Sequence, residues 1–143
     1  PDQLIDYTHS RESTFFEGGL GPLEHIDFTH PYNDELRKKI IRAAQKKSIK
    51  VITSGTYGVT QGPRLETASE ILRLAKDGCN IVGMTGMPEA ALAKEKGMPY
   101  ATIAVIVNPA AGLTNTELVL SDMLGVLSES GKTCVKILKA MED

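Results

Sequence analysis

The sequence predicts an α/β fold, because short apolar segments of strand type alternate along the chain with amphipathic segments of helical period. Residues 100–107, Tyr-Ala-Thr-Ile-Ala-Val-Ile-Val, form an uninterrupted run rich in β-branched side chains, which predicts a central strand buried on both faces. Gly78 and Gly97 follow two predicted helices, where a left-handed C-terminal residue is favoured. The 143 residues are enough for one core, so we expect a single domain over residues 1–143.

The predicted elements follow one another along the chain with few interruptions. Residues 1–33 are rich in turn residues and suggest only a short strand at Leu4–Tyr7. Asn33 is suited to cap a helix over residues 34–47, whose apolar side chains recur at helical spacing. Beyond this helix we expect strands at 50–53, 57–60, 80–83 and 100–107, and helices at 67–77, 88–96 and about 116–140.

Composition and charge exclude several classes of protein. The net charge is -2 and the basic residues are scattered, which argues against binding to nucleic acid. No apolar stretch reaches the roughly 20 residues that span a bilayer, so we expect no membrane segment. Cys79 and Cys134 lack the spacing of a metal site, which favours two reduced thiols in a cytoplasmic protein over a disulfide or a metal centre. The start at Pro1 resembles neither a signal peptide nor an initiating methionine, so we expect a chain truncated at its front.

Polar groups that could bind a ligand are concentrated where predicted strands end. In open α/β sheets, ligands bind beyond the carboxyl ends of the strands. Four turns carry such polar groups: 25–32, 62–67, 83–89 and 108–112. Any one of these polar residues, considered alone, is more often a helix cap, a turn residue or a surface histidine than a ligand-binding group. Their order and spacing together therefore carry the functional signal.

The order of motifs in these turns resembles that of a known protein family. The chain carries Gly62-Pro63-Arg64, Glu66-Thr67, Met84-Thr85, Met87-Pro88-Glu89 and Tyr100-Ala101. Over essentially all 143 residues this run resembles the trimeric purine nucleoside phosphorylases, and within them the methylthioadenosine and methylthioinosine phosphorylases. The resemblance implies a mixed sheet flanked by helices. It also implies that this chain is the C-terminal part of such a fold, without its N-terminal strands and glycine-rich phosphate loop.

The resemblance assigns roles to individual residues. Asn108 and Glu66 are the expected catalytic groups on the purine base, and Thr85 is the expected phosphate ligand. The other expected substrate contacts are Met84 on the ribose, Leu65, Ala110, Leu120 or Ser121 at the 5′ substituent, and His25, which a homotrimer would lend to a neighbouring subunit.

Asn108 bears on which base is bound. Adenine-selective relatives have an aspartate there, which only accepts hydrogen bonds, whereas an asparagine amide can donate one to a 6-keto oxygen. Glu66 can accept the N1 proton of a 6-oxopurine, and Ala110 replaces the second aspartate of the adenine-type pattern. No histidine follows His30 to bind a 5′-hydroxyl, which favours a methylthio group.

The expected reaction is phosphorolysis of S-methyl-5′-thioinosine to hypoxanthine and 5-methylthioribose 1-phosphate. Inorganic phosphate is the cosubstrate, and no metal or organic cofactor is implied. Purine nucleoside or methylthioadenosine phosphorylase activity, and an inactive fragment that only binds purines, stay open as alternatives. A dinucleotide-binding domain is disfavoured because no GxGxxG opens a helix.

Overall fold

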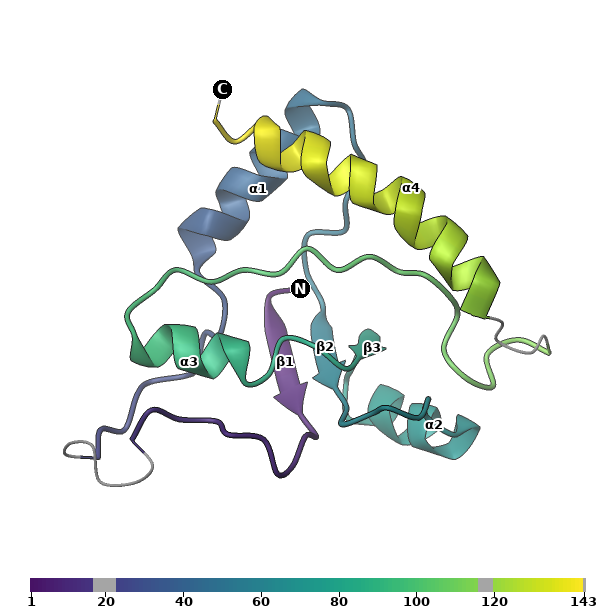
Figure 1. Ribbon diagram of the computed structural model, residues 1–143, viewed down its shortest axis with the longest axis horizontal. Coiled ribbons are helices and arrows are strands. Elements are labelled where there is room, and N and C mark those ends of the chain that lie inside the picture. Colours follow the sequence, from purple (N-terminus) through teal and green to yellow (C-terminus); the bar gives the residue numbers. More distant parts are fainter. Residues whose placement is uncertain (17–22, 116–119, 143) are drawn as a thin grey trace.

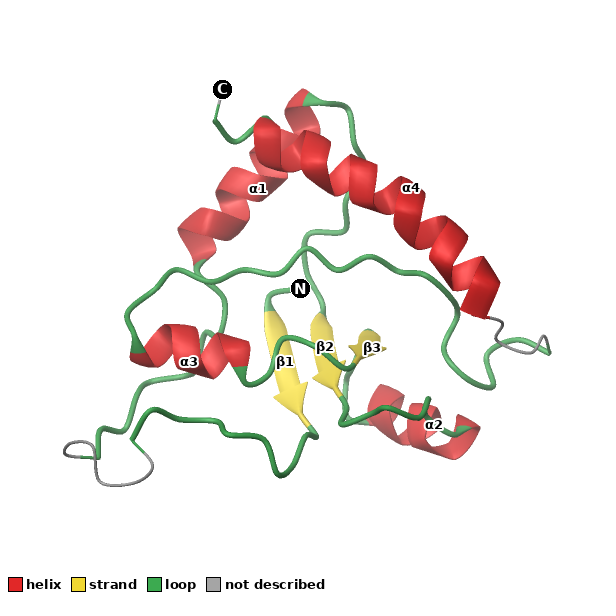
Figure 2. Ribbon diagram, in the orientation of Figure 1, coloured by secondary structure: helices red, strands yellow, loops and turns green. Residues whose placement is uncertain are grey.

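The computed structural model describes residues 1–16, 23–115 and 120–142, which form a parallel sheet with helices around it (Figures 1 and 2). The strands are β1 (Gln3–Asp6), β2 (Thr56–Val59) and β3 (Ile81–Gly83), in the spatial order β1-β2-β3. The helices are α1 (Asp34–Lys46), α2 (Ala68–Lys76), α3 (Glu89–Glu95) and α4 (Leu120–Lys139). The predicted α/β class is confirmed.

Each parallel connection in the sheet contains a helix. α1 lies between β1 and β2 in the chain, and α2 lies between β2 and β3. Leu4 is opposite Tyr57, and Tyr57 is opposite Ile81, so one row of side chains crosses all three strands. The strands within the described residues pair only in parallel. The antiparallel strand that a mixed sheet requires is therefore not among the described strands.

Local capping explains where the first two helices begin. Asn33 Oδ1 accepts a hydrogen bond from Leu36 N at 2.8 Å, as predicted for α1. At α2, Thr67 and Glu70 bond to each other's backbone N–H, which forms a capping box. Gly78 follows α2 with a φ of 95°, in the left-handed region that the sequence predicted. In the described ranges, no helix combines the length and apolar character that crossing a membrane would require.

Two strand predictions are wrong, namely residues 50–53 and 100–107. Within the described chain, no backbone-to-backbone hydrogen bond involves residues 50–54 or 101–107. The side chains of Ile52 and Ile106 are 88% and 59% exposed. An apolar extended segment becomes a strand only when a neighbouring strand pairs its N–H and C=O groups, and no described segment does so here. Residues 101–107 instead run between the sheet and the α1–α4 pair (Figure 1).

Among the described residues, the buried hydrophobic side chains form two separate clusters. One joins α1 to α4 and contains the buried side chains of Ala43, Ala44, Ile137 and Ala140. The other joins the sheet to α3 and contains Tyr57, Val59, Met87 and Ala90.

Candidate active site

The candidate site begins at the carboxyl ends of β2 and β3. Thr60 follows β2, and its N–H donates to the carbonyl of Gly83, the last residue of β3, at 2.8 Å. The next residues after Gly83 are Met84 and Thr85. Two of the turns identified in the sequence therefore leave the sheet at adjacent points.

Glu66 is held in place by a hydroxyl from the end of β2. Thr60 Oγ1 donates to Glu66 Oε1 at 2.6 Å and also lies 3.3 Å from the carbonyl oxygen of Gly83. Glu66 is half-buried in the wall of a pocket of about 380 Å³, whose other lining residues include Tyr7, His9, Gln61, Gly62 and Arg64. One carboxylate oxygen is thus fixed by Thr60.

Thr85 and Met84 are positioned by Tyr57 and Gly62. The backbone N–H of Thr85 donates to the hydroxyl of Tyr57 at 3.3 Å, and that hydroxyl also lies 3.3 Å from Thr85 Oγ1. Tyr57 is a core residue with only 6% of its surface exposed. Met84 lies against Gly62, since a Cβ on Gly62 would fall 2.5 Å from Met84 Sδ. A buried side chain therefore anchors the expected phosphate ligand.

The loop after residue 107 lies beside the start of α2. A Cβ on Gly112 would fall only 2.5 Å from the Cβ of Ala68, the first residue of α2. Ala68 is two residues after Glu66, so the loop containing Asn108 and Ala110 approaches the Glu66 segment. Asn108 Nδ2 donates to the carbonyl of Pro109 at 2.6 Å, so the amide is engaged within its own loop.

The remaining expected contacts are not all brought together. Leu65 is next to Glu66 in the chain and is 46% exposed. His25 is exposed. The segment of residues 23–32 that leads into α1 lies on the β1 and α3 side of the sheet, whereas α2 lies beyond β3 (Figure 1). The side chains of Leu120 and Ser121 lie outside the described residues. The role of each of these residues stays a prediction.

Arg11 is a site residue that sequence reasoning missed. Its guanidinium donates to the carbonyls of Thr60 at 3.3 Å, Gln61 at 3.0 Å and Met84 at 3.1 Å, and also to the carbonyl of Met87. It therefore joins the loop after β2 to the loop after β3. A single arginine in a polar stretch has no periodicity or motif, so the sequence offered no signal for it.

Two charged side chains in the pocket wall, Arg64 and Glu70, pair with each other. Arg64 donates through two nitrogens to the two carboxylate oxygens of Glu70, at 2.9 and 2.8 Å. This bidentate pair lowers the pKa of Glu70 to about 2 and raises the pKa of Arg64. Arg64 and Glu70 therefore largely neutralise each other, whereas Glu66 has a hydroxyl partner rather than a cation.

The site offers hydroxyl, carboxylate and amide groups rather than a cluster of metal ligands. Over the parts of the chain that the structure describes, no group of three or more His, Cys, Asp or Glu side chains could hold a metal ion. The expectation of a reaction without metal or organic cofactor stays a prediction.

Residues 1–141 match the family described as the phosphorylase superfamily. The chain belongs to this superfamily. It is 52% identical over 125 residues to "Probable S-methyl-5'-thioinosine phosphorylase" of Xanthomonas campestris, covering 87% of this chain and 50% of that protein. It is 42% identical over 144 residues to "6-oxopurine nucleoside phosphorylase" of Pyrococcus furiosus, covering 97% and 54%.

The solved structures of the superfamily agree with this fold. Methylthioadenosine phosphorylase from Schistosoma mansoni, in complex with adenine, superposes with a TM-score of 0.91 at 27% identity, covering 98% of this chain and 56% of that one. The resemblance to purine nucleoside phosphorylases is confirmed. The chain spans about half the length of the curated relatives it matches.

Proposed function

We propose that this phosphorylase-superfamily chain supplies the base-binding part of an enzyme that phosphorolyses 6-oxopurine nucleosides, with S-methyl-5′-thioinosine as its substrate. The observation that carries the proposal is the carboxylate of Glu66, fixed by Thr60 next to the loop that contains Asn108. The names of the Xanthomonas and Pyrococcus relatives support the same class of substrate.

Base selection follows from the hydrogen-bonding groups. The free lone pairs of Glu66 can accept the N1 proton of hypoxanthine, which adenine lacks. Asn108 Nδ2 can donate to O6 or N7 once it exchanges its bond to the Pro109 carbonyl. A buried polar group left without its partner costs about 1–3 kcal/mol, and sites built on such bonds reject mismatched analogues by up to about 10⁴–10⁵. These two side chains therefore favour 6-oxopurines.

The reaction requires a bond to form and another to break at C1′. A phosphate oxygen bonds to C1′ while the bond from C1′ to N9 breaks, and its electron pair goes to the purine. Asn108 stabilises the charge that develops at N7 and O6, an effect worth about 3–4 kcal/mol for a preorganised donor. Thr85, oriented by Tyr57, donates its hydroxyl to phosphate. One hydroxyl is a weak phosphate site, so further ligands come from the half of the relatives that this chain does not match.

We extend the proposal to a homotrimer that acts in purine salvage, since the products are a free base and a sugar phosphate. The exposure of His25 supports a contact with a neighbouring subunit. The molar mass of the assembled enzyme, measured by light scattering, tests this point. A monomeric active enzyme would refute it.

The decisive experiment follows hypoxanthine release by absorbance. The chain, alone and mixed with the unmatched part of the Xanthomonas relative, is given S-methyl-5′-thioinosine with and without phosphate. We expect phosphate-dependent release, and we expect Asn108→Asp to shift the kcat/KM ratio toward methylthioadenosine. Gln45→Glu, the same chemical change on the exposed face of α1, should leave the ratio unchanged.

The outcomes separate the competing functions. An unchanged ratio in Asn108→Asp would refute the role of Asn108 in base selection. Hypoxanthine binding in calorimetry without any release would support a purine-binding module instead of an enzyme. Absence of both binding and release would overturn the proposed function altogether.

A further inference from the structure

The hydroxyl of Thr60 has one proton and two acceptors nearby. Thr60 Oγ1 lies 2.6 Å from Glu66 Oε1 and 3.3 Å from the carbonyl oxygen of Gly83. The first distance is typical of a hydroxyl that donates to a carboxylate, whereas the second is longer than a normal O–H···O bond. The Gly83 carbonyl already accepts the backbone N–H of Thr60 at 2.8 Å. The hydroxyl proton is therefore donated to Glu66.

The backbone of Thr60 is held on both sides, which gives its hydroxyl a defined position. Its N–H is bonded to Gly83 at the end of β3, and its carbonyl accepts from the guanidinium of Arg11 at 3.3 Å. Thr60 also follows directly after Val59, a fully buried residue that ends β2. A β-branched side chain has few accessible χ1 rotamers. The donor that binds Glu66 is thus positioned by the sheet and by Arg11.

A neutral donor fixes the carboxylate of Glu66 without cancelling its charge. Arg64, two residues earlier, uses two of its nitrogens on Glu70 instead. Glu66 Oε2 makes no hydrogen bond with the described chain, so it is open to a ligand. An ionised carboxylate only accepts hydrogen bonds. Oε2 can therefore accept the N1 proton of a 6-oxopurine, whereas adenine N1 presents a second acceptor to it.

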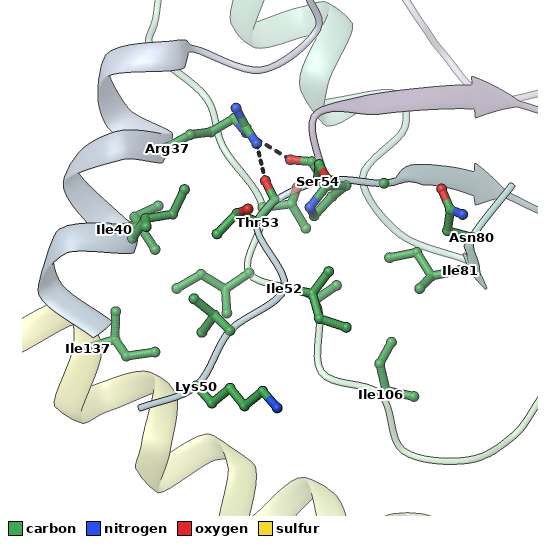
Figure 3. A pocket seen from close by; sticks show the side chains of 17 residues that line it. Arg37, Ile40, Lys50, Ile52, Thr53, Ser54, Asn80, Ile81, Ile106 and Ile137 are labelled. Atoms are coloured by element: carbon green, nitrogen blue, oxygen red, sulfur yellow. Dashed lines mark hydrogen bonds between the residues drawn. The ribbon is translucent and has the colours of Figure 1, made fainter. Parts of the chain in front are cut away.

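A second pocket, of about 360 Å³, has a different chemistry (Figure 3). Its described walls are largely apolar, and none of its lining residues is an aspartate or a glutamate. Its arginine, Arg37, donates to the backbone carbonyls of Pro1 and Thr53. It shares no lining residue with the pocket that contains Glu66. Of these two pockets, only the one with Glu66 has a carboxylate that can distinguish a protonated N1 from a bare one.

We propose that Thr60 is a positioning residue that determines base specificity, because it fixes the Glu66 carboxylate with Oε2 presented to N1 of the base. This inference deepens the proposed function and rests on it. A carboxylate that is already immobilised bonds to the N1 proton of hypoxanthine without first losing rotational freedom, which favours hypoxanthine. The same carboxylate cannot turn away from adenine N1, so two acceptors face each other and adenine is disfavoured. Thr60 therefore acts on the affinity for both bases, in opposite directions.

The experiment compares variants that remove the hydroxyl, Thr60→Val and Thr60→Ala, with Thr60→Ser, which keeps it. Calorimetry gives the Kd of hypoxanthine and of adenine for each variant of the chain, alone and mixed with the unmatched part of the Xanthomonas relative. We expect Thr60→Val and Thr60→Ala to lower the preference for hypoxanthine about tenfold, since each removes a hydrogen bond to a charged group. Thr60→Ser should keep most of the preference. Thr56→Val, the same change at the first residue of β2, is the control and should leave it unchanged.

A double-mutant cycle with Glu66→Gln separates this role from a general loosening of the loop. If Thr60 acts through Glu66, Thr60→Val should change the ratio of the two Kd values much less in the Glu66→Gln background. Equal weakening of both bases by Thr60→Val, or the same change of ratio with and without Glu66→Gln, would overturn the inference.

Failure of the inference and failure of the proposed function give different results. A wild-type protein that binds neither base overturns the proposed function, and the inference with it. A wild-type protein that prefers hypoxanthine, together with hydroxyl-free variants that prefer it as strongly, overturns only the role of Thr60.

Discussion

Replacement of Arg11 by methionine is expected to loosen the two loops of the candidate site without unfolding the helices. The guanidinium bonds to carbonyls in both loops, and Met84 directly precedes Thr85. A buried hydrogen bond contributes about 0.5–1.5 kcal/mol, and bonds to a charged group contribute more. Water can replace part of each bond because Arg11 is only half-buried. At the lower end of that range, four bonds amount to a loss of about 2 kcal/mol.

Two measurements check this value. Urea denaturation gives the change in the free energy of unfolding, and amide hydrogen exchange reports residues 84–87 separately from α1. Arg11→Lys keeps the charge but cannot bridge both loops, so it should recover only part of the loss. Arg42→Met on the exposed face of α1 is the control, since Arg42 has no hydrogen bond or ion pair with the described chain. Equal stability and equal exchange in Arg11→Met and Arg42→Met would refute the reasoning.

Two further predictions concern acid stability and the anchor of Thr85. In the folded protein the pKa of Glu70 is about 2, below its ordinary value of 4.5, so the stability contributed by its carboxylate is present above pH 4.5 and is lost as the pH falls toward 2. Glu70→Gln should therefore remove this part of the acid dependence of the urea midpoint. An unchanged acid dependence would contradict the pairing of Glu70 with Arg64 as its cause. In Gly83→Ala the new Cβ would fall 2.5 Å from the Tyr57 hydroxyl, so we expect a loss of about 1–3 kcal/mol and faster amide exchange at Thr85. Gly125→Ala on α4, where nothing lies within 4 Å, should be stabilising instead, and equal effects of the two substitutions would argue against a role for Tyr57.

The sequence was informative where structure depends on neighbours in the chain. Asn33 predicted the start of α1 because a cap acts on the N–H groups of the next turn. Gly78 predicted the end of α2 for the same kind of local reason. The order of the turns also placed Glu66 and Thr85 at neighbouring strand ends, since parallel strands end at the same edge of a sheet.

The sequence was uninformative where structure depends on a distant partner. Residues 50–53 and 100–107 have the composition of strands, but a ladder needs a second chain segment, and composition does not reveal whether one is present. Arg11 acts through carbonyls about 50 to 76 positions away in the chain, at separations that no periodicity reports. Spatial approaches such as that of Gly112 to Ala68 are likewise visible only in three dimensions.

Tyr57 couples the packing of the sheet cluster to the position of Thr85. Its ring packs with Val59, Met87 and Ala90, and its hydroxyl bonds to Thr85. A substitution such as Met87→Leu conserves most of the volume and is usually tolerated in a core, but here any rotation of the tyrosine ring also moves the hydroxyl that bonds to Thr85. Under the proposed phosphate role of Thr85, selection on turnover restricts which apolar residues this cluster can exchange. The α1–α4 cluster does not include Tyr57, so substitutions within it do not act on Thr85 through this side chain.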